Sequence, residues 1–218
     1  KGLMIAGAGA AALAVPVKIA IDYESAMADV AKVVDGLKDE AGKITPAYTA
    51  MSNQILEMTT RLPMAAKDIA AIVAAGAQSG IAKNELIGFA ESAVKMGVAF
   101  DITADQAGQS MAEMRAAFKM TQPQVIALAD QINYLGNTSP NKADKIMEVV
   151  QRIGALGEVG GFASSSIAAM AASLTSVEPD VAATGIKNII LAMTKGESAT
   201  KGQVEAFEKL KLKSTDVA

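Results

Sequence analysis

Apolar residues between Asn84 and Leu135 recur at alternating spacings of three and four. Three successive runs follow this pattern: Leu86, Phe89, Ala93, Met96 and Phe100; then Ala107, Met111, Met114 and Phe118; then Val125, Leu128, Ile132 and Leu135. Such spacing places the apolar side chains on one stripe of an α-helix. A helix with one apolar stripe must bury it, so we expect three short helices that fold back on one another.

Two breaks separate these helices, and both carry a start signal. Thr103 is followed three residues later by Gln106, and Thr121 is followed likewise by Gln124. This is the spacing of a capping box, in which the hydroxyl accepts from one free backbone N–H and the glutamine side chain returns to another. The sequence therefore predicts helix starts at both places.

The same rhythm continues on both sides of this stretch, with frequent punctuation. Thr45–Pro46 and Ser139–Pro140 each combine a capping residue with a proline, which favours a helix start, and Pro16 interrupts or starts a helix. No alternating run reaches convincing strand length. We predict an all-α fold, a compact array or bundle of about eight to ten short amphipathic helices preceded by an apolar Ala/Gly-rich helix.

Composition shifts divide the chain into four parts. We predict an apolar helix over 1–22, a helical hairpin over 23–62, a core helical domain over 63–195, and a charged C-terminal helix with a linker over 196–218. The division rests on apolar periodicity and on the Pro and Gly residues between the parts.

Within the first part, residues 2–21 are apolar except for Lys18, and three interpretations compete for this segment. Gly7, Gly9 and Ala12 match a dinucleotide-binding fingerprint, but that motif needs βαβ alternation, and the residues downstream are helical in pattern. A membrane-capable helix and a buried helix at a subunit interface both remain open, because small residues suit close helix packing in either setting. The candidate membrane or interface residues are Leu3, Met4, Ile5, Leu13, Val15, Val17, Ile19 and Ile21.

The composition argues against catalysis. The chain has no Cys and no His, which removes thiolate chemistry and the commonest general base and zinc ligand. Its net charge of −3 lacks the basic excess of a nucleic-acid binder. We interpret the acidic residues as solvated or capping groups, and predict no catalytic, cofactor or metal site; those considered are Glu85, Glu91, Asp101, Asp105 and Glu113.

The Met and Phe side chains of the central stripe allow two interpretations. They could form the core of the domain, or they could form an adaptable surface for a partner helix, because methionine conforms to many shapes. We favour the core, while noting that core and subunit interface use the same chemistry in an obligate oligomer. The residues in question are Leu86, Phe89, Met96, Phe100, Met111, Met114 and Phe118.

Several longer phrases resemble the core domain of phage tail tape measure proteins. They include ELIGFAESAVKMGVAFDITADQAGQSMAEM, VIALADQINYLGN, KADKIMEVVQRIGALGEVGGF and EPDVAATGIKNIILAM, within about residues 76–193. The segment 14–36 looks like the region that precedes this core in the same family. The match is a helical pattern with particular apolar positions and carries no catalytic signature.

The resemblance implies a structural virion protein that helps to set tail length and to deliver the genome. It implies self-association, in three or six copies as in the family, within the tail tube lumen near the tail tip. The other expected partners are tail tube proteins, tail tip or baseplate hub proteins and tail assembly chaperones. The resemblance also implies contact with the host membrane and cell envelope on ejection, only indirect contact with DNA, and no cofactor.

The sequence departs from an extended ruler, because Pro and Gly breaks recur and heptads are not sustained over the repeats that a coiled coil requires. We therefore expect a compact anchoring or initiating module near the tail tip. Two alternatives from other classes are a membrane-active, pore-forming helical module and a fragment of a cell-wall hydrolase.

Overall fold

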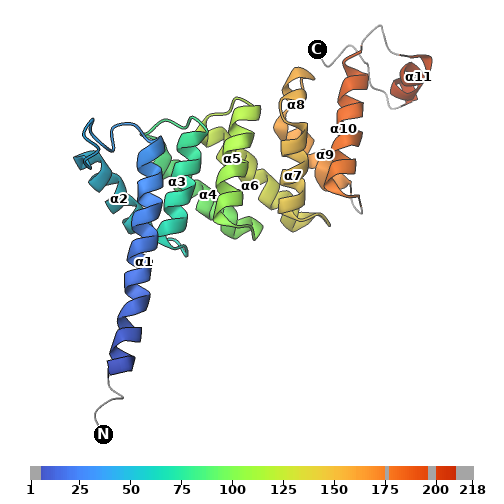
Figure 1. Cartoon of the computed structure of the whole chain (residues 1–218). Coiled ribbons are helices and arrows are strands. Elements are labelled where there is room, and N and C mark those ends of the chain that lie inside the picture. The colour runs from blue at the N-terminus through green and yellow to red at the C-terminus, as the bar shows by residue number, and fades with distance from the viewer. Residues whose placement is uncertain (1–5, 175–176, 196–199, 210–218) are drawn as a thin grey trace. The chain divides into compact units, whose positions relative to one another are not determined.

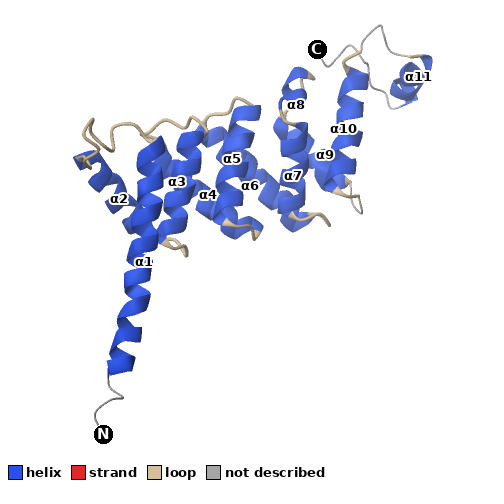
Figure 2. Ribbon diagram, in the orientation of Figure 1, coloured by secondary structure: helices blue, strands red, loops and turns tan. Residues whose placement is uncertain are grey.

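The computed structural model describes residues 6–174, 177–195 and 200–209, and within these ranges it confirms the all-α prediction. Eleven helices are present there and no strand is formed (Figures 1 and 2). The helices are α1 (Ala6–Val33), α2 (Pro46–Met58), α3 (Ala66–Gln78), α4 (Leu86–Phe100), α5 (Ala104–Ala117), α6 (Gln122–Thr138), α7 (Ala143–Ile153), α8 (Ala155–Val159), α9 (Ser164–Ser173), α10 (Pro179–Met193) and α11 (Lys201–Lys209).

The helices belong to two compact units. Unit 1 comprises residues 1–97 with 103–109, and unit 2 comprises residues 98–102 with 110–218. The four-part division expected from the sequence stays a prediction. Each unit has buried apolar side chains of its own, so each can be described by itself.

In unit 1, α3 packs against α1 and α2. Met27 and Val30 of α1 are fully buried on the side that packs against α3. Gly76 of α3 lies under the ring of Phe89, because a Cβ added there would come within 2.8 Å of two ring carbons. Close packing of a ring on a helix backbone needs a residue without a side chain at that point.

In unit 2, α7 packs against α6, α9 and α10, and α9 also packs against α6 and α10. Helices α6 and α7 approach closely at Gly136, where an added Cβ would lie 2.5 Å from the backbone nitrogen of Ala143. The Asn141 amide, in the loop between α6 and α7, donates to the carbonyls of Ala171 and Leu174 at 2.9 and 3.0 Å. These two bonds satisfy carbonyls at the C-terminal end of α9, which have no partner within the helix.

Both predicted capping boxes are present. Thr103 N–H donates to Gln106 Oε1 at 3.0 Å while Gln106 N–H donates back to Thr103 Oγ1 at 3.3 Å, and Thr121 N–H donates to Gln124 Oε1 at 2.8 Å. The cap at Thr45 is confirmed as well, with Pro46 in the first turn of α2. The expected three helices in 84–135 therefore begin and end close to the predicted breaks.

Two local predictions were wrong. Ser139–Pro140 does not start a helix: Ser139 follows the end of α6, and its hydroxyl donates to the Asn141 carbonyl at 3.3 Å, while α7 begins after Lys142. Pro16 does not start or end a helix either, because it lies inside α1. Its missing N–H leaves one α1 carbonyl without its usual bond, which costs stability but does not stop the helix there.

Candidate functional site

Six of the seven Met, Phe and Leu residues of the central stripe are buried. Leu86, Phe89 and Met96 are buried in unit 1, and Phe100, Met111 and Met114 are buried in unit 2, whereas Phe118 is half-buried. Apart from Phe118, the stripe is therefore not available as a free docking surface in this chain.

The acidic residues of the central stretch are spread over the surface. Glu91 pairs with Lys95 at 2.9 Å and with Arg61 at 3.4 Å. The hydrogen bond from Lys95 is the main reason why the pKa of Glu91 lies below its ordinary value, and the charges of Lys95 and Arg61 act in the same direction. Among the described residues, no three acidic side chains gather where they could hold a metal ion.

The strongest candidate surface is the first half of α1, which extends past α2 and α3 (Figure 1). Four branched apolar side chains are exposed there: Val15 by 64%, Val17 by 54%, Ile19 by 63% and Ile21 by 59%. A helix segment that exposes several large apolar side chains is normally covered by other protein or by lipid.

The side chains of the other four apolar residues predicted for this segment are not described. Leu3, Met4 and Ile5 lie outside the described residues, and Leu13 is described only as part of the helical backbone. Within the part of the chain that the structure describes, no helix combines the length and apolarity needed to cross a membrane.

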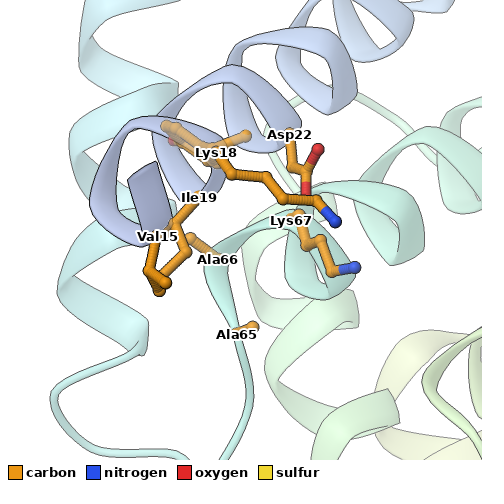
Figure 3. A pocket seen from close by; sticks show the side chains of 8 residues that line it. Val15, Lys18, Ile19, Asp22, Ala65, Ala66 and Lys67 are labelled. Atoms are coloured by element: carbon orange, nitrogen blue, oxygen red, sulfur yellow. The ribbon is translucent and has the colours of Figure 1, made fainter. Parts of the chain in front are cut away.

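A groove of about 470 Å³ runs beside this half of α1 (Figure 3). Val15 and Ile19 of α1 form one wall, and Ala65 and Ala66 at the start of α3 form the opposite side. The remaining lining residues are Lys18, Asp22, Tyr23 and Lys67. The groove is therefore mainly apolar, with charged side chains near its rim.

Sequence reasoning identified the α1 wall of the groove but missed the α3 side. Ala65 and Ala66 precede the apolar stripe of α3, and small side chains carry no distinctive pattern. Their importance comes from their position against α1, which periodicity cannot reveal.

Tyr23 lines the groove and forms a hydrogen bond with α2. Its hydroxyl donates to the Ser52 carbonyl at 3.1 Å and lies 2.9 Å from Ser52 Oγ, which ties α1 to α2. Burial raises the pKa of Tyr23 above its ordinary value; the Ser52 hydrogen bond opposes this shift, and the neighbouring Tyr48 charge adds to it.

We expect Tyr23→Phe to lower the free energy of unfolding by about 1 kcal/mol at pH 8, the usual value of one hydrogen bond. The folded pKa exceeds the unfolded one, so this group's contribution is complete below the unfolded pKa, near 10, and is lost as pH rises through the folded value. Urea unfolding from pH 8 to 11 should therefore show a smaller loss of stability for Tyr23→Phe than for the wild type.

Tyr134→Phe is the matched control, because the Tyr134 side chain is mostly exposed. It should leave the stability at pH 8 unchanged, because no hydrogen bond of a buried hydroxyl is lost. Equal slopes for the wild type and Tyr23→Phe would show that burial of the Tyr23 hydroxyl has no effect on its titration.

Comparison with known proteins identifies the family. The model of the phage-related minor tail protein family matches residues 52–218. The chain is 31% identical over 214 residues to a probable tape measure protein of Halomonas phage phiHAP-1; the match covers 93% of this chain and 24% of that protein. The chain thus spans about a quarter of the length of this relative.

No solved structure matches the chain significantly, so the assignment rests on sequence. The matched region contains all of unit 2, together with α3, α4 and most of α2. The family model therefore covers well over half of the chain, including the central stretch from which the tape measure resemblance was inferred. This chain belongs to the phage-related minor tail protein family.

Proposed function

We propose that this chain is the compact helical module of a tape measure-type minor tail protein, with a structural rather than a catalytic role. It anchors and initiates tail assembly at the tail tip, and through this role it contributes to tail length determination and genome delivery. Family membership and similarity to a probable tape measure protein support the proposal.

The observation that carries the compact role is the packing of the central helices. A ruler that measures by extension must be one continuous rod, which rises about 1.5 Å per residue. Here α4, α5 and α6 are separate helices, and most of their stripe residues are buried within the two units. Asp101 and Lys119 take positive φ values of 56° and 48° at the ends of α4 and α5, so the chain turns at both places.

The proposed partners follow from this role. Copies of the chain associate with one another, and the assembled module contacts the tail tube, the tail tip or baseplate hub and the assembly chaperones. We place it in the tube lumen near the tip, with only indirect contact to DNA. The exposed apolar half of α1 supports self-association, because it leaves a large apolar surface uncovered in a single chain.

A deletion in the encoding phage tests the compact role against a ruler role. We expect removal of α5 (Ala104–Ala117) to block tail assembly, because Met111 and Met114 would leave the interior and their unit would lose part of its core. An extended ruler would instead yield infectious particles with tails shortened by about 20 Å, at 1.5 Å per deleted residue. Electron microscopy of the particles measures the tail length.

A matched control inserts the same number of residues into the exposed loop between α1 and α2, at Glu40–Ala41. Surface loops tolerate such insertions, since the added closure cost grows slowly with length. We expect normal tail yield and unchanged tail length. Viable particles with shorter tails from the α5 deletion would refute the compact role.

The membrane-active alternative makes a different prediction. If the exposed apolar residues of α1 insert into lipid, the purified chain should release dye from phosphatidylethanolamine/phosphatidylglycerol vesicles, and a chain lacking residues 1–22 should not. For a module that acts in assembly through protein contacts, we expect no difference in leakage between the two chains.

A further inference from the structure

The exposed half of α1 carries two separate apolar faces. Successive helical residues are about 100° apart, so Val15 and Ile19 lie within about 40° of each other, whereas Val17 and Ile21 point about 200° away from them. All four side chains are more than half exposed. One neighbouring helix could not cover both faces.

The two faces differ in shape. Val15 and Ile19 form the wall of the groove against Ala65 and Ala66, so this face is concave (Figure 3). Val17 and Ile21 point away from the side on which the fully buried Val30 packs, by about 140° and about 180° on the helical wheel. We call the Val17–Ile21 face the ridge, because both side chains are more than half exposed in the part of unit 1 that the structure describes.

The two faces also differ in charge. Lys18 and Lys67 line the groove together with a single acid, Asp22. The exposed Glu24 lies next to the ridge on the same helix face, since it is three residues from Ile21. Within the described residues, no ion pair joins Lys67 or Glu24 to another side chain. A ridge with an acid therefore stands opposite a groove with an excess of lysine.

We propose that the groove of one copy receives the Val17–Ile21 ridge of a second copy of this chain, with Glu24 of the ridge beside Lys67 of the groove. The inference rests on the self-association that forms part of the proposed function. It adds that the contact is heterologous, joining two different surfaces. Every copy then has one groove and one ridge to offer, so association continues until a ring closes.

This arrangement accounts for the apolar surface on both sides of α1. A two-fold contact of groove with groove would leave the ridge exposed, and a contact of ridge with ridge would leave the groove empty. The groove is large enough for two branched aliphatic side chains, and the small side chains of Ala65 and Ala66 leave room for them.

Cysteine cross-linking tests the proposal, because the chain has no Cys of its own. Ala66→Cys places a thiol in the groove and Ile21→Cys places one on the ridge. When a tagged Ala66→Cys chain is mixed with an untagged Ile21→Cys chain and gently oxidised, we expect a product that contains one chain of each kind. Each variant alone should stay uncross-linked.

Two outcomes of this experiment would overturn the proposal. Disulfide-linked dimers of Ala66→Cys with itself, formed as readily as the mixed product, would show a two-fold contact. Absence of the mixed product, with the chain either monomeric or still associated by light scattering, would show that this groove does not receive this ridge. Neither outcome touches the tail-assembly role, which the α5 deletion tests separately.

Charge and apolar variants supply an independent readout by sedimentation. Val17→Asp with Ile21→Asp should weaken association at least tenfold, while Val181→Asp, at an exposed apolar position on α10, should leave it unchanged. Glu24→Lys should weaken it about fivefold, and Lys67→Glu added to the same chain should restore it. Helical circular dichroism confirms folding in each case, and failure of the second change to restore association would exclude the Glu24–Lys67 contact.

Discussion

Gly136→Ala should destabilise unit 2 by about 3 kcal/mol, at the upper end of the usual cost of overpacking. The added Cβ would lie 2.5 Å from the Ala143 nitrogen and 2.8 Å from its Cα, so it would meet backbone rather than the end of a flexible side chain. Helices α6 and α7 would have to separate. Thermal unfolding followed by circular dichroism should show a transition on the order of 10 °C lower.

Gly185→Ala is the matched control within the same unit. Gly185 also lies inside a helix, but a Cβ added there has open space around it. This change should raise stability by about 0.5–1 kcal/mol, because alanine is the better helix former. Adding Ala143→Gly to Gly136→Ala should not restore wild-type stability, since the backbone clash remains; full restoration would show that only the Ala143 methyl opposes the change.

Phe89→Ala should destabilise unit 1 by about 4 kcal/mol, the range found when a buried aromatic side chain is removed. Phe89 is fully buried and is among the largest such side chains in the chain. Its ring packs on Gly76, so its loss leaves a cavity directly above the α3 backbone. Urea unfolding should show a lower midpoint, with local loss of protection from hydrogen exchange in α3 and α4.

A double-mutant cycle with Gly76→Ala tests whether the destabilisation by Phe89→Ala arises from packing of the ring on Gly76. Alone, Gly76→Ala should cost about 1–3 kcal/mol, because its Cβ would come within 2.8 Å of the Phe89 ring. In the Phe89→Ala background the same methyl should cost less or even stabilise, since it occupies part of the cavity. Strict additivity of the two changes would contradict the packing of Phe89 on Gly76.

Much of this fold could be predicted from local signals. The three central helices, their breaks and their capping boxes follow from apolar spacing and from threonine–glutamine pairs three residues apart, both of which act within a few residues. The cap at Thr45 has the same local origin. By contrast, a third capping box, with Thr200 N–H donating to Gln203 Oε1 at 3.0 Å, has the same spacing but was not recognised.

The failures arose where distant residues compete with local signals. Ser139–Pro140 has the composition of a helix start, but Asn141 is held by the carbonyls at the end of α9, 30 or more residues away, and α7 begins only after Lys142. A capping preference of about 1 kcal/mol is small beside such tertiary contacts. The glycines show the same limit of local signals. The sequence does not distinguish Gly136, which lies against the backbone of Ala143, from Gly185, which faces open space.

The candidate site, too, was predicted only in part from the sequence. The sequence by itself determined that this chain is helical, that it lacks Cys and His, and that the first part of α1 is apolar except for Lys18, because composition and periodicity are local properties. Only the tertiary structure decided that Val15 and Ile19 face Ala65 and Ala66 across a groove while Val17 and Ile21 stay uncovered. The reason is physical: a stripe specifies that a face must be buried, and only the packing of distant helices specifies what buries it.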